Sequence, residues 1–530
     1  MASQRRNATP SSLLDAHNLT QDLIAAALPQ TDRLRLAATC RTLRAASLRW
    51  FPDAQAELHA GDTTAAESLA AWLRHYRVRA HLKLVIPQAL ATSNTAAAAS
   101  ATLHPLATCP AVAGCIASLS GAAPSPGMHL PTPCLAPFCS LERLDFLHGL
   151  FGLQGSLEPL WHLQGLRRLS LAGGGLIGEW AGISRLSRLE SLDLCEHNMR
   201  AVAGALPALG CLTELDISDD GEEQVDWSPL TALQRLQVLS LQLERKGNVA
   251  AQLPALARTL RRLALDAGNL AAIPPELAVC TGLTRLEVSC NPDNAWVAAQ
   301  QAGFSIASLS HLATLTHLHH LSMSILDRDS SDLPEVLSTL TALTHLSLGD
   351  VFQEGWEHLR PLKHLQELLL DNVHLLAESA AELAGALSAL PVLRTLSLDS
   401  MDFFEGGWGD VWPALVRVTR LQALNLGWCD AAPLPPQITD MRELSSLSLR
   451  YCPEDDTPQA AASLEHLRPL AGTLADLDLS SWHMTELPPV LTALTSLTHL
   501  DLSGNRIAGG WEQLQALPLL VRLDMQSQQV

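Results

Sequence analysis

The stretch Leu497-Thr498-His499-Leu500-Asp501-Leu502 places leucine at its first, fourth and sixth positions. This LxxLxL spacing recurs in sixteen copies, mostly 22 to 25 residues apart and in a few cases 28 to 35, with an occasional Phe, Ile, Val or Met at the sixth position. The copies begin at Leu141, Leu166, Leu189, Leu212, Leu236, Leu260, Leu283, Leu318, Leu343, Leu365, Leu393, Leu421, Leu444, Leu474, Leu497 and Leu520. A period of this size is typical of a repeat protein, so the 530 residues are not read as three or four independent domains.

Each copy predicts one short strand, in which alternation directs the second and third leucines inward. One strand with its turn cannot bury an apolar face alone, so the copies must stack. The pattern resembles the leucine-rich repeat family over residues 141–530, with weaker copies at Leu82–Leu84 and near Val112. We therefore expect an α/β repeat fold, a curved solenoid with a parallel sheet on its inner face and a small all-α module before it.

Proline or tryptophan also recurs nine residues before the first leucine of a copy, which supports this register. Proline-containing copies there read IPPEL, LPEVL, LPPQI and LPPVL, as in plant-type repeats, whereas others carry tryptophan. These residues are Pro274, Pro334, Pro435 and Pro488, and Trp180, Trp227, Trp356, Trp412 and Trp511. The tryptophans could form a ligand site, but their fixed phase away from the inner strand favours packing in the core or on the outer side.

The position three residues after the last leucine carries Asn291 and Asn505, and in two other copies Cys429 and Cys452. Asparagine and cysteine can both hydrogen-bond turn backbone. We therefore expect these cysteines to be structural, as in the Cys-containing subclass of the repeat.

Residues 11–51 lack the repeat and predict two or three short amphipathic helices with a turn at Leu28–Pro29. The segment resembles an F-box, with matches at Leu19, Asp22, Leu23, Leu28, Pro29, Asp32, Leu34, Leu36, Cys40, Arg41 and Arg44. Thr20 replaces the opening proline and Leu43 the usual tryptophan. The resemblance implies that Leu19, Asp22, Leu23, Leu28, Pro29 and Leu34 contact the Skp-type linker of a cullin-RING ubiquitin ligase. The alternative is a helical cap that shields the end of the solenoid.

The remaining segments complete the expected organisation. We expect a disordered tail over 1–10 and a connecting segment over 52–78 that contains an amphipathic helix at 63–77. Degenerate repeats with an Ala-, Pro- and Ser-rich insertion follow over 79–140, and a second insertion covers 292–311.

Composition excludes several classes of function. The net charge is −19, and an acidic surface repels nucleic acid and anionic lipid. Eleven cysteines without a CxxC pair suggest reduced thiols, and neither a secretion signal nor an apolar run of about 18 residues is present. We expect a cytoplasmic protein, with the cytoskeleton, the ciliary axoneme or the nucleus as alternatives.

Motifs that could support catalysis or metal binding are incomplete. Gly173–Gly178 satisfies GxGxxG without a following βαβ unit, and the EF-hand-like start at Asp216 has Trp227 where a glutamate is needed. Cys109, Cys115, Cys134 and Cys139 lack the tight spacing of zinc sites. Several of the histidines lie in LTHL contexts, as exposed strand positions. We expect no enzymatic activity, cofactor or metal.

Candidate partner-binding residues follow from the register. Asp478, Asp501 and Asp524 should stack as an uncompensated row on the inner face, and Asp193 and Asp216 occupy the same strand position. Trp428 and Tyr451 should be neighbours, with Arg450 beside them, and such residues dominate binding hot spots. Alternatively, aspartate is simply a common residue at this position of the repeat, and the aromatic pair serves only packing. We interpret the chain as a non-catalytic adaptor with a basic protein client, or as a scaffold without a ligase link.

Overall fold

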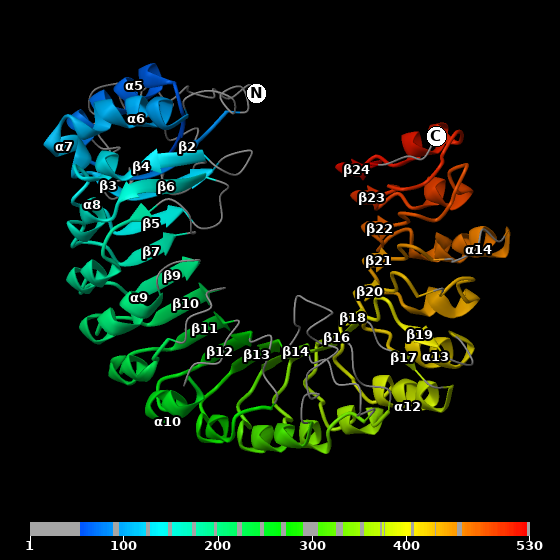
Figure 1. The fold of residues 1–530 in the computed structure, drawn as a ribbon. Coiled ribbons are helices and arrows are strands. Elements are labelled where there is room, and N and C mark those ends of the chain that lie inside the picture. Colours follow the sequence, from blue (N-terminus) through cyan, green and yellow to red (C-terminus); the bar gives the residue numbers. More distant parts are fainter. Residues whose placement is uncertain are drawn as a thin grey trace, which may run out of the picture. The chain divides into compact units, whose positions relative to one another are not determined.

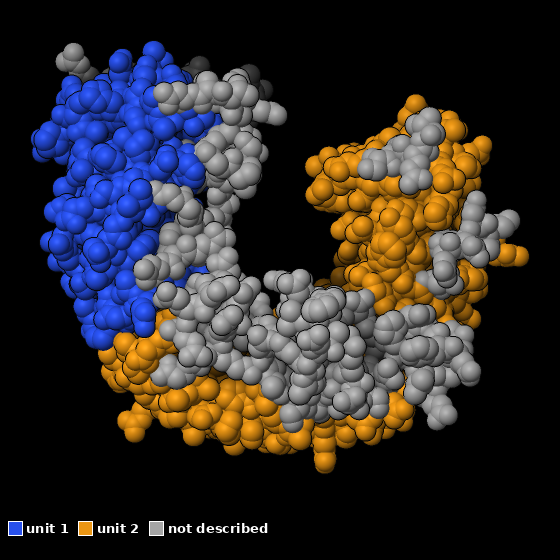
Figure 2. Space-filling view, in the orientation of Figure 1, with its two compact units in different colours: residues 1–219 blue, residues 220–530 orange. Residues whose placement is uncertain are grey.

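The computed structural model describes residues 53–87, 95–122, 128–146, 151–171, 176–195, 199–219, 225–243, 249–266, 272–289, 306–324, 332–349, 354–371, 374–375, 377–403, 408–429, 431–452 and 458–526. The chain divides into two compact units, residues 1–219 and 220–530 (Figure 2). Each unit is a leucine-rich repeat solenoid, with parallel strands along one side and short helices on the other (Figure 1).

The sheet of the first unit pairs its parallel strands in chain order. They are β1 (Asp53–His59), β2 (Arg79–Val85), β3 (Ile116–Ala122), β5 (Arg143–Phe146), β7 (Arg168–Leu171), β9 (Ser191–Cys195) and β10 (Glu214–Asp219). A smaller sheet contains β4 (Met128–Pro131), β6 (Phe151–Ser156) and β8 (Leu176–Ile177). The connecting segments form α5 (Thr63–Tyr76), α6 (Thr95–Ala107), α7 (Pro110–Ala113), α8 (Glu158–Trp161), α9 (Met199–Ala205) and the 3-10 turns η3 (Thr132–Leu135), η4 (Trp180–Arg185) and η5 (Leu206–Ala208).

The sheet of the second unit continues the same pattern. Its strands are β11 (Val238–Leu243), β12 (Arg262–Asp266), β13 (Arg285–Ser289), β14 (His320–Ser324), β15 (His345–Gly349), β16 (Glu367–Asp371), β18 (Thr395–Ser397), β20 (Ala423–Asn425), β21 (Ser446–Ser448), β22 (Asp476–Asp478), β23 (His499–Asp501) and β24 (Arg522–Asp524). The pair β17 (His374–Leu375) and β19 (Asp402–Phe403) lies outside this sheet.

The other side of the second unit is built mainly from 3-10 helices. They are η6 (Ser228–Ala232), η7 (Ala250–Gln252), η8 (Pro275–Val279), η9 (Ile306–Thr314), η10 (Glu335–Thr339), η11 (Trp356–Leu359), η12 (Pro436–Asp440), η13 (Leu464–Leu470), η14 (Pro489–Ala493) and η15 (Trp511–Ala516). The α-helices are α10 (Leu253–Leu256), α12 (Ala377–Leu387), α13 (Trp408–Leu415) and α14 (Pro458–Ser463).

The repeat leucines form the core as the sequence predicts. In β15, for example, Leu346 and Leu348 are each 1% exposed, whereas Ser347 between them faces solvent in part. Burial of one such side chain contributes about 1.5–3 kcal/mol. We call the sheet surface formed by the intervening residues the inner face.

The proline and tryptophan positions also have their expected roles. Pro274, Pro334, Pro435 and Pro488 cap the 3-10 turns η8, η10, η12 and η14 in extended conformation, with φ between −64° and −73°. Four of the five tryptophans are buried, which confirms packing. Trp511 departs from this pattern at 37% exposure, because no later copy covers it in the described residues.

The ladder of strands starts earlier than the leucine pattern. β1 precedes the expected amphipathic helix and pairs with β2, which carries the weak copy at Leu82–Leu84. The sequence did not reveal β1, because Ala56 stands at the position that pairs with Leu82. Helix α5 lies where predicted; Asp62 caps it by accepting the Ala65 N–H at 2.9 Å, and Leu73 is fully buried. The segments 1–10 and 11–51, and most of the 292–311 insertion, lie outside the described residues.

Candidate protein-interaction surface

A series of left-handed turns follows the last strands of the second unit. The turn residue stands two positions after the third leucine of the LxxLxL pattern, and in successive copies it is Ser400, Trp428, Tyr451, Ser481 and Gly504, with φ of 58°, 58°, 54°, 57° and 70°. Each donates its backbone N–H to the carbonyl of the next repeat, for example Trp428 to Arg450 at 2.7 Å and Tyr451 to Ser480 at 3.0 Å. The hydrogen-bond ladder therefore imposes this conformation, which L-residues adopt at a cost of about 1–2 kcal/mol.

Trp428 and Tyr451 stack on one another at these turns, as the register predicted. Their ring centroids are 3.5 Å apart and the ring planes differ by 16°. The Arg450 guanidinium carbon lies 5.5 Å from the Tyr451 centroid and 6.0 Å from that of Trp428, within the range of a cation–π contact. Trp428 remains 49% exposed, so the pair is not core. We call Trp428, Arg450 and Tyr451 the aromatic shelf.

Buried groups directly after the shelf residues fix its backbone. Cys429 Sγ donates to the Leu398 carbonyl at 2.7 Å, and Cys452 Sγ donates to the Leu426 carbonyl at 2.8 Å. Burial raises the pKa of the Cys429 thiol, which keeps it protonated as a donor. The indole of Trp408 donates to the Cys429 carbonyl at 2.6 Å. The expected structural role of these cysteines is thus confirmed.

The aspartate row has the predicted register but is not uncompensated. Asp478 pairs with Asp501, and Asp501 with Asp524, on adjacent strands. Asp524 forms an ion pair with Arg522 at 2.6 Å. Asp478 accepts the Ser480 N–H at 2.9 Å, and Asp501 accepts the Ser503 N–H at 2.8 Å. These local turns give the carboxylates a structural role that partly offsets their mutual repulsion.

Asp193 and Asp216 belong to the first unit and are register partners on β9 and β10. Asp193 accepts a hydrogen bond from the Ser170 hydroxyl at 3.1 Å. The structure therefore places these two aspartates side by side. The candidates of the second unit form separate groups, which are the aromatic shelf and the aspartate row.

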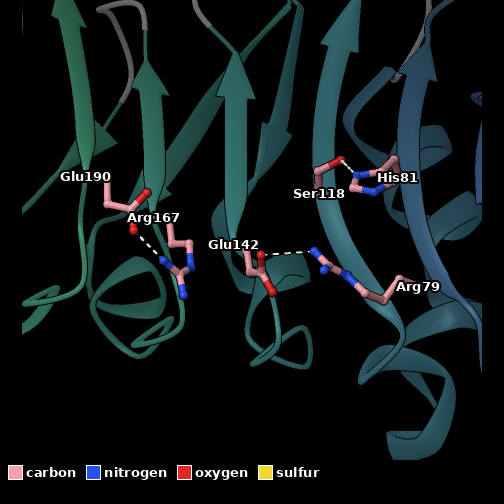
Figure 3. A network of polar contacts seen from close by, with 6 residues as sticks. All are labelled: Arg79, His81, Ser118, Glu142, Arg167 and Glu190. Atoms are coloured by element: carbon pink, nitrogen blue, oxygen red, sulfur yellow. Dashed lines mark hydrogen bonds and ion pairs between the residues drawn. The ribbon is translucent and has the colours of Figure 1, made fainter. Parts of the chain in front are cut away.

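A polar network on the inner face of the first unit was missed by the sequence reasoning (Figure 3). Arg79 pairs with Glu142 at 3.0 Å, Arg167 pairs with Glu190, and the His81 ring is 2.8 Å from the Ser118 hydroxyl. These residues border a pocket of about 380 Å³. The signal available in the sequence was the alternating charge of Glu142, Arg167 and Glu190, which hold the same repeat position directly before β5, β7 and β9. Because its charges are paired and exposed, the network contributes little net attraction for a partner.

The predicted contacts of the F-box-like segment with a Skp-type linker stay a prediction. Leu19, Asp22, Leu23, Leu28, Pro29 and Leu34 lie outside the described residues. Within the described ranges, no cluster of three or more His, Cys, Asp or Glu side chains could hold a metal. Of the described helices, none has both the length and the hydropathy that a membrane-spanning segment requires.

Comparison with known proteins supports the repeat assignment. The leucine-rich repeat family model matches residues 496–517. The chain is similar to the receptor-like protein EIX1 of Solanum lycopersicum, 27% identical over 207 residues that cover 38% of this chain and 19% of that protein.

Three of the solved structures that match the chain are a leucine-rich repeat protein, a receptor complex and an internalin. They are the leucine-rich repeat protein LIC12759 of Leptospira interrogans (16% identity, covering 88% of this chain and 99% of that one, TM-score 0.42), the plant peptide hormone receptor RGFR1 in complex with RGF2 (15%, 84% and 80%, 0.33) and the internalin inlF of Listeria monocytogenes (19%, 73% and 82%, 0.31). These values are too low to transfer a function.

Proposed function

We propose that this leucine-rich repeat protein is a non-catalytic adaptor that holds a protein client on the aromatic shelf. The single observation behind the proposal is the placement of two stacked aromatic side chains in left-handed turns, with Trp428 49% exposed and Tyr451 partly exposed. Glycine occupies the equivalent turn at position 504. Serine occupies it at Ser400 and Ser481, so the left-handed turn belongs to the repeat, and the aromatic surface is what distinguishes Trp428 and Tyr451.

The physical properties of the shelf suit client binding. The rings are already stacked before a client arrives, so little side-chain entropy is lost on binding. Trp, Tyr and Arg are the residue types that most often dominate binding energy. Asp478 and Asp501 are register partners on the adjacent strands β22 and β23 of the same unit, so we expect the client segment to be basic.

The finer part of the proposal connects the adaptor to a ubiquitin ligase. It rests on the F-box resemblance of residues 11–51, in which Leu23 and Leu28 would meet the Skp-type linker. The chain would then act by proximity, bringing client and ligase together. Without that link, the same shelf would serve a scaffold in the cytoplasm or on the cytoskeleton.

Client binding is tested by copurification with the full chain and with Trp428→Ala. The matched control is Trp511→Ala, which removes another exposed tryptophan outside the shelf. We expect Trp428→Ala to weaken the main client by about 2 kcal/mol or more, roughly 30-fold, and Trp511→Ala to leave it unchanged. Identical client lists for wild type and Trp428→Ala would reject the shelf as the site.

The ligase link is tested separately on the full chain. Wild type should bind a purified Skp-type linker, and Leu23→Asp or Leu28→Asp should abolish that binding while client copurification persists. If the wild-type chain binds its client but no Skp-type linker, the adaptor proposal holds and the ligase link is rejected.

A further inference from the structure

A column of charged and titratable side chains crosses β12 to β16 of the second unit. Arg262, Arg285, His320, His345 and Glu367 are successive register partners on these parallel strands. Neighbouring strands are about 4.8 Å apart, so each side chain interacts with the next. The column changes from basic to acidic along the sheet, with two histidines at its centre.

The two histidine rings are stacked. Their centroids are 3.8 Å apart and the planes differ by 12°. Two imidazolium rings at this separation repel each other, so a proton on one opposes a proton on the other. Burial lowers the pKa of His320 first, and the neighbouring His345 and Arg285 lower it further.

The hydrogen bonds of His345 define its tautomer. The Thr344 hydroxyl donates its one proton to the His319 carbonyl at 3.0 Å. Toward His345 Nδ1, at 2.8 Å, the same hydroxyl can therefore only accept. Nδ1 of His345 therefore carries a proton, and Nε2 faces Glu367 Oε2 at 3.5 Å. Because Nε2 of His345 is directed at Glu367, His320 is the ring that is available to an incoming anion.

The rings border a pocket of about 540 Å³ on the inner face. Its polar lining consists of Arg285, Glu287, His320, His345, Glu367 and the hydroxyls of Ser322 and Ser347. Arg285 is ion-paired with Glu287 through Nε. The charged groups around the histidines are Arg262, Arg285, Glu287, His319 and Glu367. The charges of the two arginines and two glutamates cancel, so a proton on His320 makes the pocket positive.

We propose that this pocket binds a carboxylate side chain from an acidic segment of a protein partner, with uptake of a proton at the His320–His345 stack. Arg285 and the serine hydroxyls provide donors at any pH, and protonated His320 adds a charge-assisted one. A pocket of about 540 Å³ has room for a single carboxylate side chain, which a protein segment can insert, whereas the phosphates of a nucleic acid come as an extended row that the chain's charge of −19 repels. This pocket is independent of the aromatic shelf, and its failure would leave the adaptor proposal unaffected.

The test measures fluorescence anisotropy of a labelled oligoglutamate peptide with the full chain at about pH 7.5 and about pH 5.5. Glutamate stays ionised over this range whereas histidine titrates within it, so a change in affinity reports on the protein. We expect wild type to bind about tenfold or more tightly at the lower pH. The double change His320→Gln/His345→Gln should abolish that gain, and Arg285→Gln should weaken binding at both pH values.

His499→Gln is the matched control. His499 occupies the same strand position and makes the same contact with a preceding threonine, its Nδ1 lying 2.9 Å from Thr498 Oγ1, but its register partners are Asp476 and Arg522. This variant should bind like wild type. Circular dichroism should be the same for all variants, since the changed side chains lie on the inner face.

Three results would overturn the proposal. The first is no binding of oligoglutamate at either pH, and the second is a pH dependence that persists in His320→Gln/His345→Gln. The third is equal binding of oligoglutamine, or of a single-stranded oligonucleotide in place of the peptide.

Discussion

Trp428 and Tyr451 occupy the same left-handed turn position in consecutive repeats, with ring centroids 3.5 Å apart. Their backbone N–H groups remain in the ladder, donating to the carbonyls of Arg450 and Ser480. The ladder therefore fixes the backbone, and the side chains are free to project to the surface. This arrangement explains how one edge of the sheet can present a rigid aromatic pair without interrupting the repeat.

Replacing a left-handed serine by glycine should stabilise the protein. Ser400 has φ of 58°, and its hydroxyl makes only a long contact of 3.4 Å with Asp399. Ser400→Gly should raise the free energy of unfolding by about 0.5–1 kcal/mol, because relief of the left-handed cost exceeds the added entropy of the unfolded chain. Urea denaturation measures the change. Ser448→Gly, within strand β21, is the control and should destabilise; stabilisation of both variants, or of neither, would contradict the explanation.

Asn505 should be among the most sensitive positions of the second unit. It is fully buried, accepts the N–H groups of Trp482 and Met484, and donates to the carbonyls of Leu479 and Leu502 at 2.9 Å. Asn505→Ala leaves these groups without that partner and should cost about 2–4 kcal/mol in denaturant unfolding. Cys452→Ala removes one thiol hydrogen bond at the equivalent position and should cost less. An equal loss in the two variants would argue that lost packing, rather than hydrogen bonding, dominates.

The sequence was sufficient for the register but not for the local geometry. Because inward leucines recur at fixed spacing, they align the strands, and alignment placed Trp428 beside Tyr451 and Asp478 beside Asp501. Turn conformation depends on hydrogen bonds between repeats, so the left-handed φ of these aromatic residues and the turns that satisfy the aspartates were not apparent.

The histidine stack was missed for a different reason. His345 lies in an LTHL context and was read as an ordinary exposed strand position, and His320, at the same place in the preceding copy, was not considered with it. Pairing of β14 with β15 aligns the two residues, but stacking depends on the orientation of the rings, which the leucine spacing does not specify. The F-box-like residues, including Leu23 and Leu28, lie outside the described part of the chain, and their role stays a prediction.

Leu346 tests the architecture of the core. It is 1% exposed and pairs with Leu321 and Leu368 on the adjacent strands. Leu346→Ala should cost about 2–5 kcal/mol, the range for deleting buried volume of this size. Because repeats contact mainly their neighbours, hydrogen exchange should accelerate first around β14–β16. Ser347→Ala, one residue away on the inner face, is the control; uniform acceleration across the described strands would contradict local coupling.

The cysteines should differ in reactivity. The backbone N–H of Val112 lowers the pKa of the Cys109 thiol, helped by the Arg74 side chain, whereas burial raises the pKa of Cys280 to about 11. The thiolate is the reactive form, so iodoacetamide at about pH 8 should label Cys109 well before Cys280 in the native protein. Peptide mass spectrometry measures the order. Arg74→Gln should slow labelling of Cys109 and leave Cys280 unchanged; faster labelling of Cys280 would refute the assignment.

His320 should make the folded protein sensitive to acid even without a ligand. Burial is the main cause that lowers the pKa of His320 below the ordinary value of 6.5, and the neighbouring His345 lowers it further. His320 therefore binds a proton more readily in the unfolded chain than in the folded one. The resulting destabilisation is absent above about pH 6.5 and becomes complete once the pH falls below the folded-state pKa. His320→Gln removes this linkage, so its melting temperature should fall less than that of wild type between about pH 7.5 and about pH 5. His499→Gln should keep the wild-type dependence, and NMR titration of the His320 ring should give a midpoint below 6.5. A midpoint at or above 6.5 would contradict the expectation, because a ring stacked at 3.8 Å on a second histidine and facing Arg285 should resist protonation.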